Sequence, residues 1–293
     1  MKTKLRKVVI PVAGLGTRGL PFTKEVPKEL IPVIDTPAIH FIVEEVLAAG
    51  IDQIIFVTAK GKSALEDYFD LSPQLEDALR KKGNDVLADQ VKKIGSQCEV
   101  ISIRQKSPLG LGHAIACARS VVGDEMFAVC LGDEIFPQWF PRKQNGLQKL
   151  VEAALRMESS VVGVMEVPKS ETGAYGIIDI GGKILAGEPV PVQKTIEKPK
   201  PELAPSHYAI IGRYVFRPEI FDNLARLKPG VGGEFQLTDA MAPLCRAGAL
   251  YAMAMEGPRF DVGNHLSYLK ASIEFAFRRP ELADGLKSYL KSL

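Results

Sequence analysis

The stretch VVIPVAGLGTRGLPFTKEVPKELIP, residues 8–32, joins a short apolar run to a loop rich in glycine, proline and basic residues. The apolar run predicts a buried β-strand, and Gly14 and Gly16 predict a tight turn where it ends. A glycine turn of this kind exposes backbone N–H groups that can bind an anion. Because Arg18 and Lys28 add fixed positive charge beyond the turn, the stretch predicts a polyphosphate site at the end of a strand.

Two familiar phosphate motifs do not fit this loop. Gly14, Gly16 and Gly19 match the G-x-G-x-x-G spacing of dinucleotide-binding folds, but Pro21 and Pro27 interrupt the segment in which the required helix would run. The pattern G-x-x-x-x-G-K-[ST] of P-loop ATPases is absent from the sequence. Hydride transfer and ordinary P-loop chemistry are therefore disfavoured. Taken alone, the motif also fits a plain glycine turn with a surface arginine.

Length and composition are typical of a globular protein. The chain has 293 residues, 46% of them hydrophobic and 25% charged, enough for one elaborated domain or two small ones. A net charge of +2 gives no basic character that would predict nucleic-acid binding. No apolar stretch approaches the roughly 18 residues of a membrane span, and no signal peptide is expected. The four scattered cysteines predict free thiols in a reducing compartment, the cytoplasm.

Strand and helix patterns alternate along the chain, which predicts an α/β fold with a largely parallel sheet. Strands are predicted at 54–58, 100–103, 126–131, 159–167, 174–180, 195–200, 208–216 and 250–255. Helices are predicted at 39–47, 60–95, 114–119, 217–228, 236–247 and 266–293, the last with a break near Pro280. No repeat or linker is evident, so we expect one domain over 1–293. Its nucleotide half would span about 1–135 and its second-substrate half about 136–293.

Two aspartates, Asp133 and Asp261, are candidate metal ligands. Asp133 comes directly after the buried strand at 126–131, where open α/β sheets bind their ligands. A carboxylate beside phosphates is a natural ligand for Mg²⁺, although a loop or N-cap aspartate is the plainer interpretation. Asp261 precedes a glycine and opens the last helix. It is either the N-cap of that helix or a second carboxylate ligand that would bind the metal ion together with Asp133.

Two further segments carry side chains suited to a base and to a sugar phosphate. Gln105 offers both a donor and an acceptor for the edge of uracil or thymine, and Gly110 lets backbone approach the base, unless this segment is only a turn. Glu197 suits sugar hydroxyls, and Lys198 suits a sugar phosphate. On a strand these two side chains would face opposite sides and need not pair. A solvated pair on an edge strand is the alternative.

Taken in order, these motifs resemble those of the sugar-1-phosphate nucleotidylyltransferases, in particular the bacterial UTP–glucose-1-phosphate uridylyltransferases. The resemblance covers nearly the full length. It rests on AGLGTR at 13–18, PKEL at 27–30, RQ…GLGHA at 104–114, GD at 132–133, AYGIID at 174–179, EKPKP at 197–201, GEFQLTDA at 233–240 and FDVGN at 260–264. Each motif is weak or moderate alone, but together and in this order they are highly specific. The resemblance implies a Rossmann-like, doubly wound, mixed and mainly parallel sheet with helices on both faces.

The resemblance also implies the reaction and its residues. The phosphate of glucose 1-phosphate would attack the α-phosphorus of UTP in line, and pyrophosphate would leave. The implied nucleotide ligands are Ala13, Gly14, Gly16 and Thr17, with Gln105 and Gly110 at the uracil. The implied catalytic residues are Arg18, Lys28 and Asp133. Mg²⁺ is implied at Asp133 and Asp261. Glucose 1-phosphate is implied at Gly176, Glu197, Lys198 and the backbone near Ile210.

Some features leave the substrate pair open. Many uridylyltransferases of this type carry Pro-Asp where this chain has Gly132-Asp133, and Gly19 stands where a larger apolar residue is usual. The alternatives are a thymidylyltransferase, another sugar 1-phosphate, or a non-catalytic sugar-nucleotide-binding protein. A non-catalytic protein is disfavoured, because every position at which the reaction requires a charge carries a charged residue in this sequence. The family implies homodimers or homotetramers, and the apolar positions in 236–250 and 266–277 fit either an interface or the core.

Overall fold

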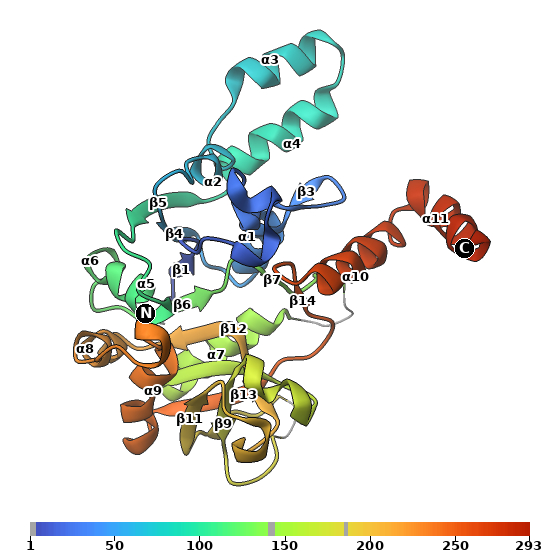
Figure 1. The fold of residues 1–293 in the computed structure, drawn as a ribbon. Helices are drawn as coiled ribbons and strands as arrows, with labels where there is room; N and C mark the ends of the chain where they lie inside the picture. Colours follow the sequence, from blue (N-terminus) through green and yellow to red (C-terminus); the bar gives the residue numbers. More distant parts are fainter. Residues whose placement is uncertain (1–3, 140–143, 185–186) are drawn as a thin grey trace.

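The glycine-rich stretch follows strand β1 (Lys7–Pro11), which lies inside the central sheet of the computed structural model (Figure 1). The structure describes residues 4–139, 144–184 and 187–293. The other sheet strands are β4 (Gln53–Thr58), β5 (Glu99–Arg104), β6 (Phe127–Cys130), β8 (Ser160–Glu166), β9 (Gly176–Asp179), β10 (Val190–Pro191), β11 (Lys194–Glu197), β12 (Tyr208–Phe216) and β13 (Leu250–Ala254). Among the described residues these ten strands form one sheet, in the path β10–β13–β8–β12–β6–β1–β4–β5, with β9 on β12 and β11 on β9.

The sheet is mixed, as the family resemblance implied. Strands β6, β1, β4 and β5 run parallel to one another, and β13 runs parallel to β8. Strand β12 is antiparallel to both β6 and β8 and joins the two parts of the sheet. The predicted Rossmann-like arrangement with helices on both faces is therefore confirmed. The carboxyl ends of β1, β4 and β6 meet at one edge, the place where such sheets bind ligands.

Alternation along β1 divides the core between the two faces of the sheet. On one face Val8 and Ile10 pack beneath α1 (Ala38–Ala48) and α7 (Gly146–Met157). On the other face Val9 packs with α5 (Leu111–Cys117), α6 (Arg119–Val122), α8 (Glu219–Ala225) and α9 (Leu237–Arg246). All three β1 side chains are fully buried. The strand is therefore anchored from both sides, and the loop that follows it begins from a fixed point.

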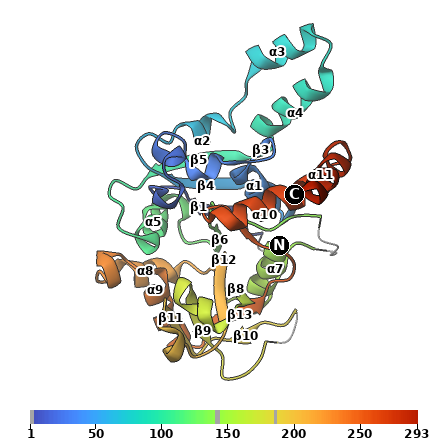
Figure 2. The same cartoon turned by 45° about the vertical axis from the view of Figure 1, so that its right-hand side comes forward.

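Two pairs of helices extend from the body of the molecule (Figures 1 and 2). Helices α3 (Pro73–Lys81) and α4 (Asp85–Ser96) project beyond α2 (Ala64–Asp67), in the segment where polar helices were predicted. Helices α10 (His265–Ala276) and α11 (Pro280–Ser292) form the chain end and are separated at Pro280, as predicted. No helix within the described ranges is long and apolar enough to span a membrane.

Short elements complete the fold around the sheet edge. The two-residue strands β7 (Glu134–Ile135) and β14 (Phe260–Asp261) pair antiparallel, and β2 (Pro32–Val33) pairs with β3 (Thr36–Pro37). A third apolar cluster, which includes Ile135, Phe260 and Phe275, packs beneath α10. The short 3-10 helices are η1 (Thr17–Gly19), η2 (Phe22–Lys24), η3 (Lys28–Leu30), η4 (Lys169–Ala174), η5 (Pro201–Leu203) and η6 (Val231–Gly233). The loop after β1 thus contains short turns where a dinucleotide-binding fold has a long helix.

An ion pair lies in the interior of the molecule. Arg213 on β12 and Glu45 on α1 are both fully buried, and their side chains join at 2.8 Å. Arg213 also donates to the backbone carbonyl of Glu134 at 2.7 Å and lies 4.7 Å from the ring centre of Phe136. Because Glu134 follows Asp133 in the chain, this arginine ties the central strand to the segment that carries a predicted metal ligand.

Candidate active site

A cleft of about 610 Å³ opens at the edge of the sheet where β1 and β6 end. Its lining includes all of the predicted nucleotide and catalytic residues and one predicted sugar-phosphate ligand: Ala13, Gly14, Gly16, Thr17, Arg18, Lys28, Gln105, Gly110, Asp133 and Lys198. Glu29, Leu111 and Glu234 are further lining residues. Residues from five separate parts of the sequence therefore share one cleft.

The predicted phosphate loop, residues 13–19 after β1, is held by a buried threonine, Thr23, that nothing in the sequence pattern singles out. Gly16 adopts a left-handed conformation, with φ of 66°, and its carbonyl accepts from Thr23 Oγ1 at 2.6 Å and from the Gly19 N–H at 2.9 Å. A Cβ placed on Gly19 would lie 2.6 Å from Thr23 Cγ2. Gly19 is therefore needed for this close turn, which explains why a larger apolar residue is not found there.

Behind the loop lies a buried pair formed by Glu29 and Lys62. Glu29 is fully buried, and Lys62 Nζ donates to its Oε2 at 3.0 Å and to the Val12 carbonyl. Burial raises the pKa of the Glu29 carboxyl, although Lys62 and Lys28 oppose the change. A Cβ on Gly132 would meet Glu29 Cγ at 3.1 Å, so the Gly132-Asp133 form leaves room for this buried glutamate. The sequence does not predict this role for Lys62, because the residue lies in a segment that is polar throughout.

Two carboxylates and two cations meet at the end of the cleft. Lys28 Nζ donates to Asp133 Oδ2, and the Arg18 guanidinium lies 3.8 Å from Asp133 and 3.5 Å from Asp261. Burial would raise the pKa of the Asp133 carboxyl, but the charges of Lys28 and Arg18 outweigh it and lower that pKa. The carboxylate is therefore ionised and acts as an acceptor.

The pair Asp133 and Asp261 fits a divalent cation. A Cβ placed on Gly263 would lie 3.0 Å from Arg18 Nη2, 3.0 Å from Asp261 Oδ1 and 3.3 Å from Asp133 Oδ2, so the absent side chain leaves a small space beside both carboxylates and the Arg18 guanidinium. In the part of the chain that the structure describes, no three histidine, cysteine or acidic side chains gather as a complete protein ligand set. Two carboxylates that rely on substrate phosphates for further oxygens match the coordination habit of Mg²⁺.

Asp261 does not have the helix-capping role considered as an alternative. The N-cap of α10 is Asn264, whose side chain accepts from the Ser267 N–H at 3.0 Å. Asp261 lies three residues earlier, where its Oδ1 accepts from the Gly263 N–H at 2.8 Å. The pairing of β14 with β7 places it opposite Glu134, one residue beyond Asp133.

The loop after β5 forms the other end of the cleft. Gly110 has φ of +95°, and a Cβ there would lie 2.8 Å from the Cβ of Glu234 and 3.2 Å from backbone atoms of Phe235. The Phe235 N–H donates to the Leu109 carbonyl at 2.8 Å, and the Gly112 N–H donates to the Phe235 carbonyl at 2.9 Å. The segment at 234–235 therefore binds the loop that carries the predicted base ligands. This segment belongs to the motif GEFQLTDA at 233–240, for whose residues no role was predicted.

Replacement of Gly110 with alanine is expected to weaken nucleotide binding selectively. The new Cβ meets backbone of the segment at 234–235, and the positive φ is unfavourable for alanine, so the loop must move. We expect the KM for the nucleotide to rise about tenfold or more, while the KM for the second substrate changes little. Gly123→Ala is a matched control, because Gly123 also has a positive φ, of 69°, and its Cβ would meet nothing within 4 Å. Equal changes in both variants would contradict this role for the loop contact.

The predicted sugar-phosphate residues gather at β9 and β11. A Cβ on Gly176 would lie 2.7 Å from Thr238 Cγ2, 3.3 Å from Glu197 Oε2 and 3.4 Å from Ile210 Cδ1. Thr238 Oγ1 donates to Glu197 Oε2 at 3.1 Å, which orients the carboxylate. Thr238 is a further residue without an assigned role in the sequence analysis.

The expectation that Glu197 and Lys198 face opposite sides is wrong. Strand β11 ends at Glu197, and Lys198 has a left-handed backbone conformation with φ of 42°. This turn brings Lys198 Nζ to 3.5 Å from Glu197 Oε1 and leaves the lysine in the lining of the cleft. The two side chains therefore pair with each other, and the Lys198 side chain, which is 58% exposed, stays in contact with solvent.

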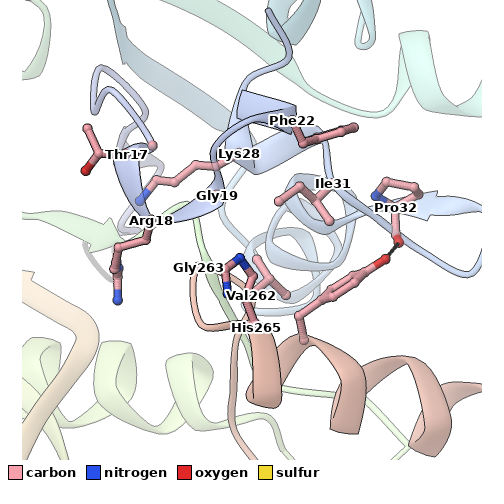
Figure 3. Close-up of a pocket in the computed structure, with 12 residues that line it drawn as sticks. Thr17, Arg18, Gly19, Phe22, Lys28, Ile31, Pro32, Val262, Gly263 and His265 are labelled. Carbon is pink, nitrogen blue, oxygen red and sulfur yellow. Dashed lines mark hydrogen bonds between the residues drawn. The ribbon is translucent and has the colours of Figure 1, made fainter. Parts of the chain in front are cut away.

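A second cavity, of about 500 Å³, adjoins the phosphate loop from the side of α10 (Figure 3). Gly16, Thr17, Arg18 and Lys28 line both spaces. The rest of its lining is mainly apolar and comes from the loop after η1, β2 and the start of α10: Gly19, Phe22, Ile31, Pro32, Val262, Gly263, His265 and Tyr268. The Tyr268 hydroxyl donates to the Pro32 carbonyl at 3.2 Å, which fixes α10 against the loop.

Comparisons with known proteins agree with this geometry. A family model described as nucleotidyl transferase matches residues 7–276. The UTP–glucose-1-phosphate uridylyltransferase of Bacillus subtilis is 47% identical over 290 residues, which cover 99% of this chain and 97% of that protein. A second enzyme of that name from Staphylococcus saprophyticus is also 47% identical, covering 99% and 98% of the two chains.

Solved structures give the same result. The UTP-bound UGPase from Acinetobacter baumannii superposes with a TM-score of 0.91 at 39% identity, covering 99% of this chain and all of that one. A UDP-glucose pyrophosphorylase complexed with UDP-glucose superposes with a TM-score of 0.83 at 36% identity, covering 94% of this chain and all of the other. The whole architecture, including both parts of the sheet, is therefore shared with proteins whose structures hold these nucleotides.

Proposed function

This chain belongs to the nucleotidyl transferase family, and from that premise we propose that it transfers the uridylyl group of UTP to α-D-glucose 1-phosphate, giving UDP-glucose and pyrophosphate. Relatives of this name align over nearly the whole chain, and a UTP-bound relative shares its fold. One observation in the cleft carries the proposal. The cations Arg18, Lys28 and Lys198 and the carboxylate Asp133 line one cleft of about 610 Å³, and Arg18 also pairs with Asp261.

The reaction needs no covalent enzyme intermediate. The phosphate of glucose 1-phosphate is largely a dianion at neutral pH, because its second pKa is about 6, and it is a nucleophile without a catalytic base. Catalysis therefore consists of positioning the two phosphates in line and stabilising charge as pyrophosphate leaves. Arg18 and Lys28 are the residues suited to that charge, with the N–H groups of the loop at Gly14 to Thr17 around the phosphates. The new P–O bond forms at the α-phosphorus as the bond to pyrophosphate breaks.

We assign Mg²⁺ as the cofactor and Asp133 and Asp261 as the residues that would hold it. When bound there, the ion would neutralise phosphate charge and template the in-line geometry. The protein contribution is the placement of both carboxylates beside the space left by Gly263. Arg18 pairs with both carboxylates, so it also keeps them from repelling one another.

The remaining predicted ligands divide into two groups. Ala13, Gly14, Gly16 and Thr17 surround the nucleotide phosphates, and Gln105 and Gly110 contact uracil. Gly176, Glu197, Lys198 and the Ile210 region contact glucose 1-phosphate. Thr238 donates to one carboxylate oxygen of Glu197, and Lys198 lies beside the other oxygen. These contacts orient the carboxylate, which supports its role as an acceptor for sugar hydroxyls.

Replacement of Lys198 with alanine is expected to separate the two substrates. Lys198 supplies positive charge to the sugar phosphate, so its loss should raise the KM for glucose 1-phosphate much more than that for UTP, by about tenfold or more. Lys200→Ala serves as a matched control, since Lys200 is an exposed lysine two residues away that is outside the cleft lining. A larger effect on UTP would show that the two halves of the cleft are assigned the wrong way round.

A substrate matrix tests the proposed function directly. Coupled pyrophosphate release is measured with purified protein and Mg²⁺, crossing UTP, dTTP, CTP, ATP and GTP with glucose 1-phosphate and galactose 1-phosphate. The expected maximum of kcat/KM is at UTP with glucose 1-phosphate. A maximum at dTTP or at another sugar would keep the reaction class and change the substrate, because one methyl group is discriminated by only about 1–3 kcal/mol. Absence of release with every pair, from folded protein, would contradict catalysis.

We further propose that the enzyme works as a homodimer or homotetramer in the cytoplasm. Helix α10 exposes Leu266, Leu269 and Ile273 to solvent by 61%, 55% and 37%, on an element that extends from the body (Figure 1). Such apolar faces favour self-association. Sedimentation equilibrium at micromolar concentration should give a multiple of 31.9 kDa, and a monomer mass would contradict the proposal. The four free cysteines are typical of a reducing compartment.

A further inference from the structure

The side-chain amide of Gln105 is held in one orientation by two neighbours. Gln105 is 8% exposed and lies just after β5. Its Nε2 is 3.1 Å from the carbonyl oxygen of Gly110 and 2.9 Å from His113 Nδ1. Because a carbonyl oxygen only accepts, the amide group beside Gly110 must be the NH₂ and not the oxygen. The second amide hydrogen is then directed to His113, whose Nδ1 accepts it in the tautomer that carries its proton on Nε2.

This orientation determines what Gln105 presents to a base. With both amide hydrogens used inside the protein, Oε1 remains for the cleft that Gln105 lines. Among the described residues no donor reaches this oxygen, and it does not belong to the buried polar atoms that lack a partner. An amide oxygen only accepts hydrogen bonds. The cleft therefore offers a fixed acceptor and selects a base edge that donates.

We propose that His113 is a positioning residue that makes the enzyme select uracil over cytosine, an inference that rests on the proposed uridylyl transfer. Uracil has a donor at N3, whereas cytosine has an acceptor at the same place, so Gln105 Oε1 attracts the first and repels the second. A reversed amide would favour cytosine. Reversal in the native loop would set the amide oxygen against both Gly110 O and His113 Nδ1. Thymine also carries a donor at N3, so this device does not separate UTP from dTTP.

The position of His113 is itself supported by the segment at 234–235, which precedes α9. Its ring lies 6.1 Å from that of Phe235, centroid to centroid, with an interplanar angle of 34°. Phe235 is bound to the loop through the backbone hydrogen bonds at Leu109 and Gly112. His113 also lies on α5, one residue before the buried Ala114, so the helix backbone is fixed. The ring is therefore held beside Gln105 and does not simply fill space.

The test compares variants that keep or remove the acceptor of His113. His113→Phe keeps a planar ring and removes the acceptor, and His113→Asn keeps an acceptor near the Nδ1 position. The kcat/KM values for UTP, CTP and dTTP are measured at saturating glucose 1-phosphate. Where turnover of CTP is too slow to follow, its inhibition constant against UTP gives the same comparison. His207→Phe is the matched control, since His207 is exposed and lies at the start of β12 outside the cleft lining.

We expect His113→Phe to lower the ratio of kcat/KM for UTP to kcat/KM for CTP by about tenfold, which corresponds to the loss of one hydrogen bond. The effect is limited to one hydrogen bond because the Gly110 carbonyl still accepts the other amide hydrogen. The UTP to dTTP ratio should stay within about twofold of wild type. His113→Asn should restore most of the UTP to CTP ratio. His207→Phe should change neither ratio.

Three results would overturn the proposal. The first is an unchanged UTP to CTP ratio in His113→Phe, and the second is an equal loss with all three nucleotides, which would indicate a purely structural role. The third is a failure of His113→Asn to exceed His113→Phe in that ratio. If the phenylalanine variant does not fold, His113→Ala takes its place against His113→Asn. Failure of the proposed function is separate, because wild-type protein would then give no activity with UTP and glucose 1-phosphate.

Discussion

Asp133→Asn is expected to give a folded protein whose turnover is lower than that of wild type by about a hundredfold or more. The carboxylate accepts from Lys28 and lies 3.8 Å from Arg18, and these charges keep its pKa low against the effect of burial. Asparagine keeps the size of the side chain but removes the negative charge. A neutral amide is a poor ligand for a hard divalent cation, and Lys28 loses its counterion.

The measurement for this variant is kcat with UTP and glucose 1-phosphate over a titration of Mg²⁺. Circular dichroism establishes that the variant is folded. A partial recovery at high Mg²⁺ is expected, because the second carboxylate, Asp261, remains. Asp284→Asn is the matched control on the exposed surface of α11, where the aspartate side chain is 93% exposed. Turnover near that of wild type at ordinary Mg²⁺ would remove Asp133 from the site.

Arg213→Met is expected to destabilise the protein by about 3–5 kcal/mol, because it leaves a buried carboxylate without a partner. Arg213 and Glu45 are both 0% exposed, and two guanidinium nitrogens donate to Glu45 Oε2 at 2.8 and 3.1 Å. The other Glu45 oxygen has no hydrogen-bond partner in the structure, so the arginine is its main compensation. Loss of the guanidinium also frees the Glu134 carbonyl, which it holds at 2.7 Å.

Urea unfolding of the single and double variants tests this expectation. Glu45→Gln with Arg213→Met should be more stable than Arg213→Met alone, because the unpaired charge is then absent. Arg217→Met is a matched control, since the Arg217 side chain is 40% exposed and its ion pair with Glu219 is solvated. A loss below about 1 kcal/mol in Arg213→Met, or no recovery in the double variant, would contradict the account of the buried pair.

The sequence predicted well the site residues that directly follow a β-strand. The loop of Gly14 to Arg18 and the carboxylate of Asp133 follow buried apolar strands, and parallel strands place their carboxyl ends at one edge. The prolines at 21 and 27 correctly excluded the long helix of a dinucleotide-binding fold. These features depend on local sequence and on the sheet geometry that such sequence implies.

Contacts between distant segments could not be derived in this way. Asp261 reaches Asp133 through the pairing of β7 and β14, strands of two residues with no periodic signal. Lys198 turns toward Glu197 because its backbone is left-handed, a conformation that the sequence Glu-Lys-Pro does not predict. Lys62 and Thr23 stabilise the phosphate loop from behind, and each is an ordinary polar residue in its own segment.

Exchange of labelled pyrophosphate into UTP distinguishes direct transfer of the uridylyl group from transfer through a covalent enzyme intermediate. Because three cations and a carboxylate line one cleft, we expect both phosphates to bind there and the uridylyl group to pass directly from UTP to the sugar phosphate. We expect exchange only when UDP-glucose or glucose 1-phosphate is present, together with net formation of UDP-glucose. Rapid exchange with UTP, Mg²⁺ and protein alone would reveal a covalent uridylyl-enzyme and would contradict direct transfer.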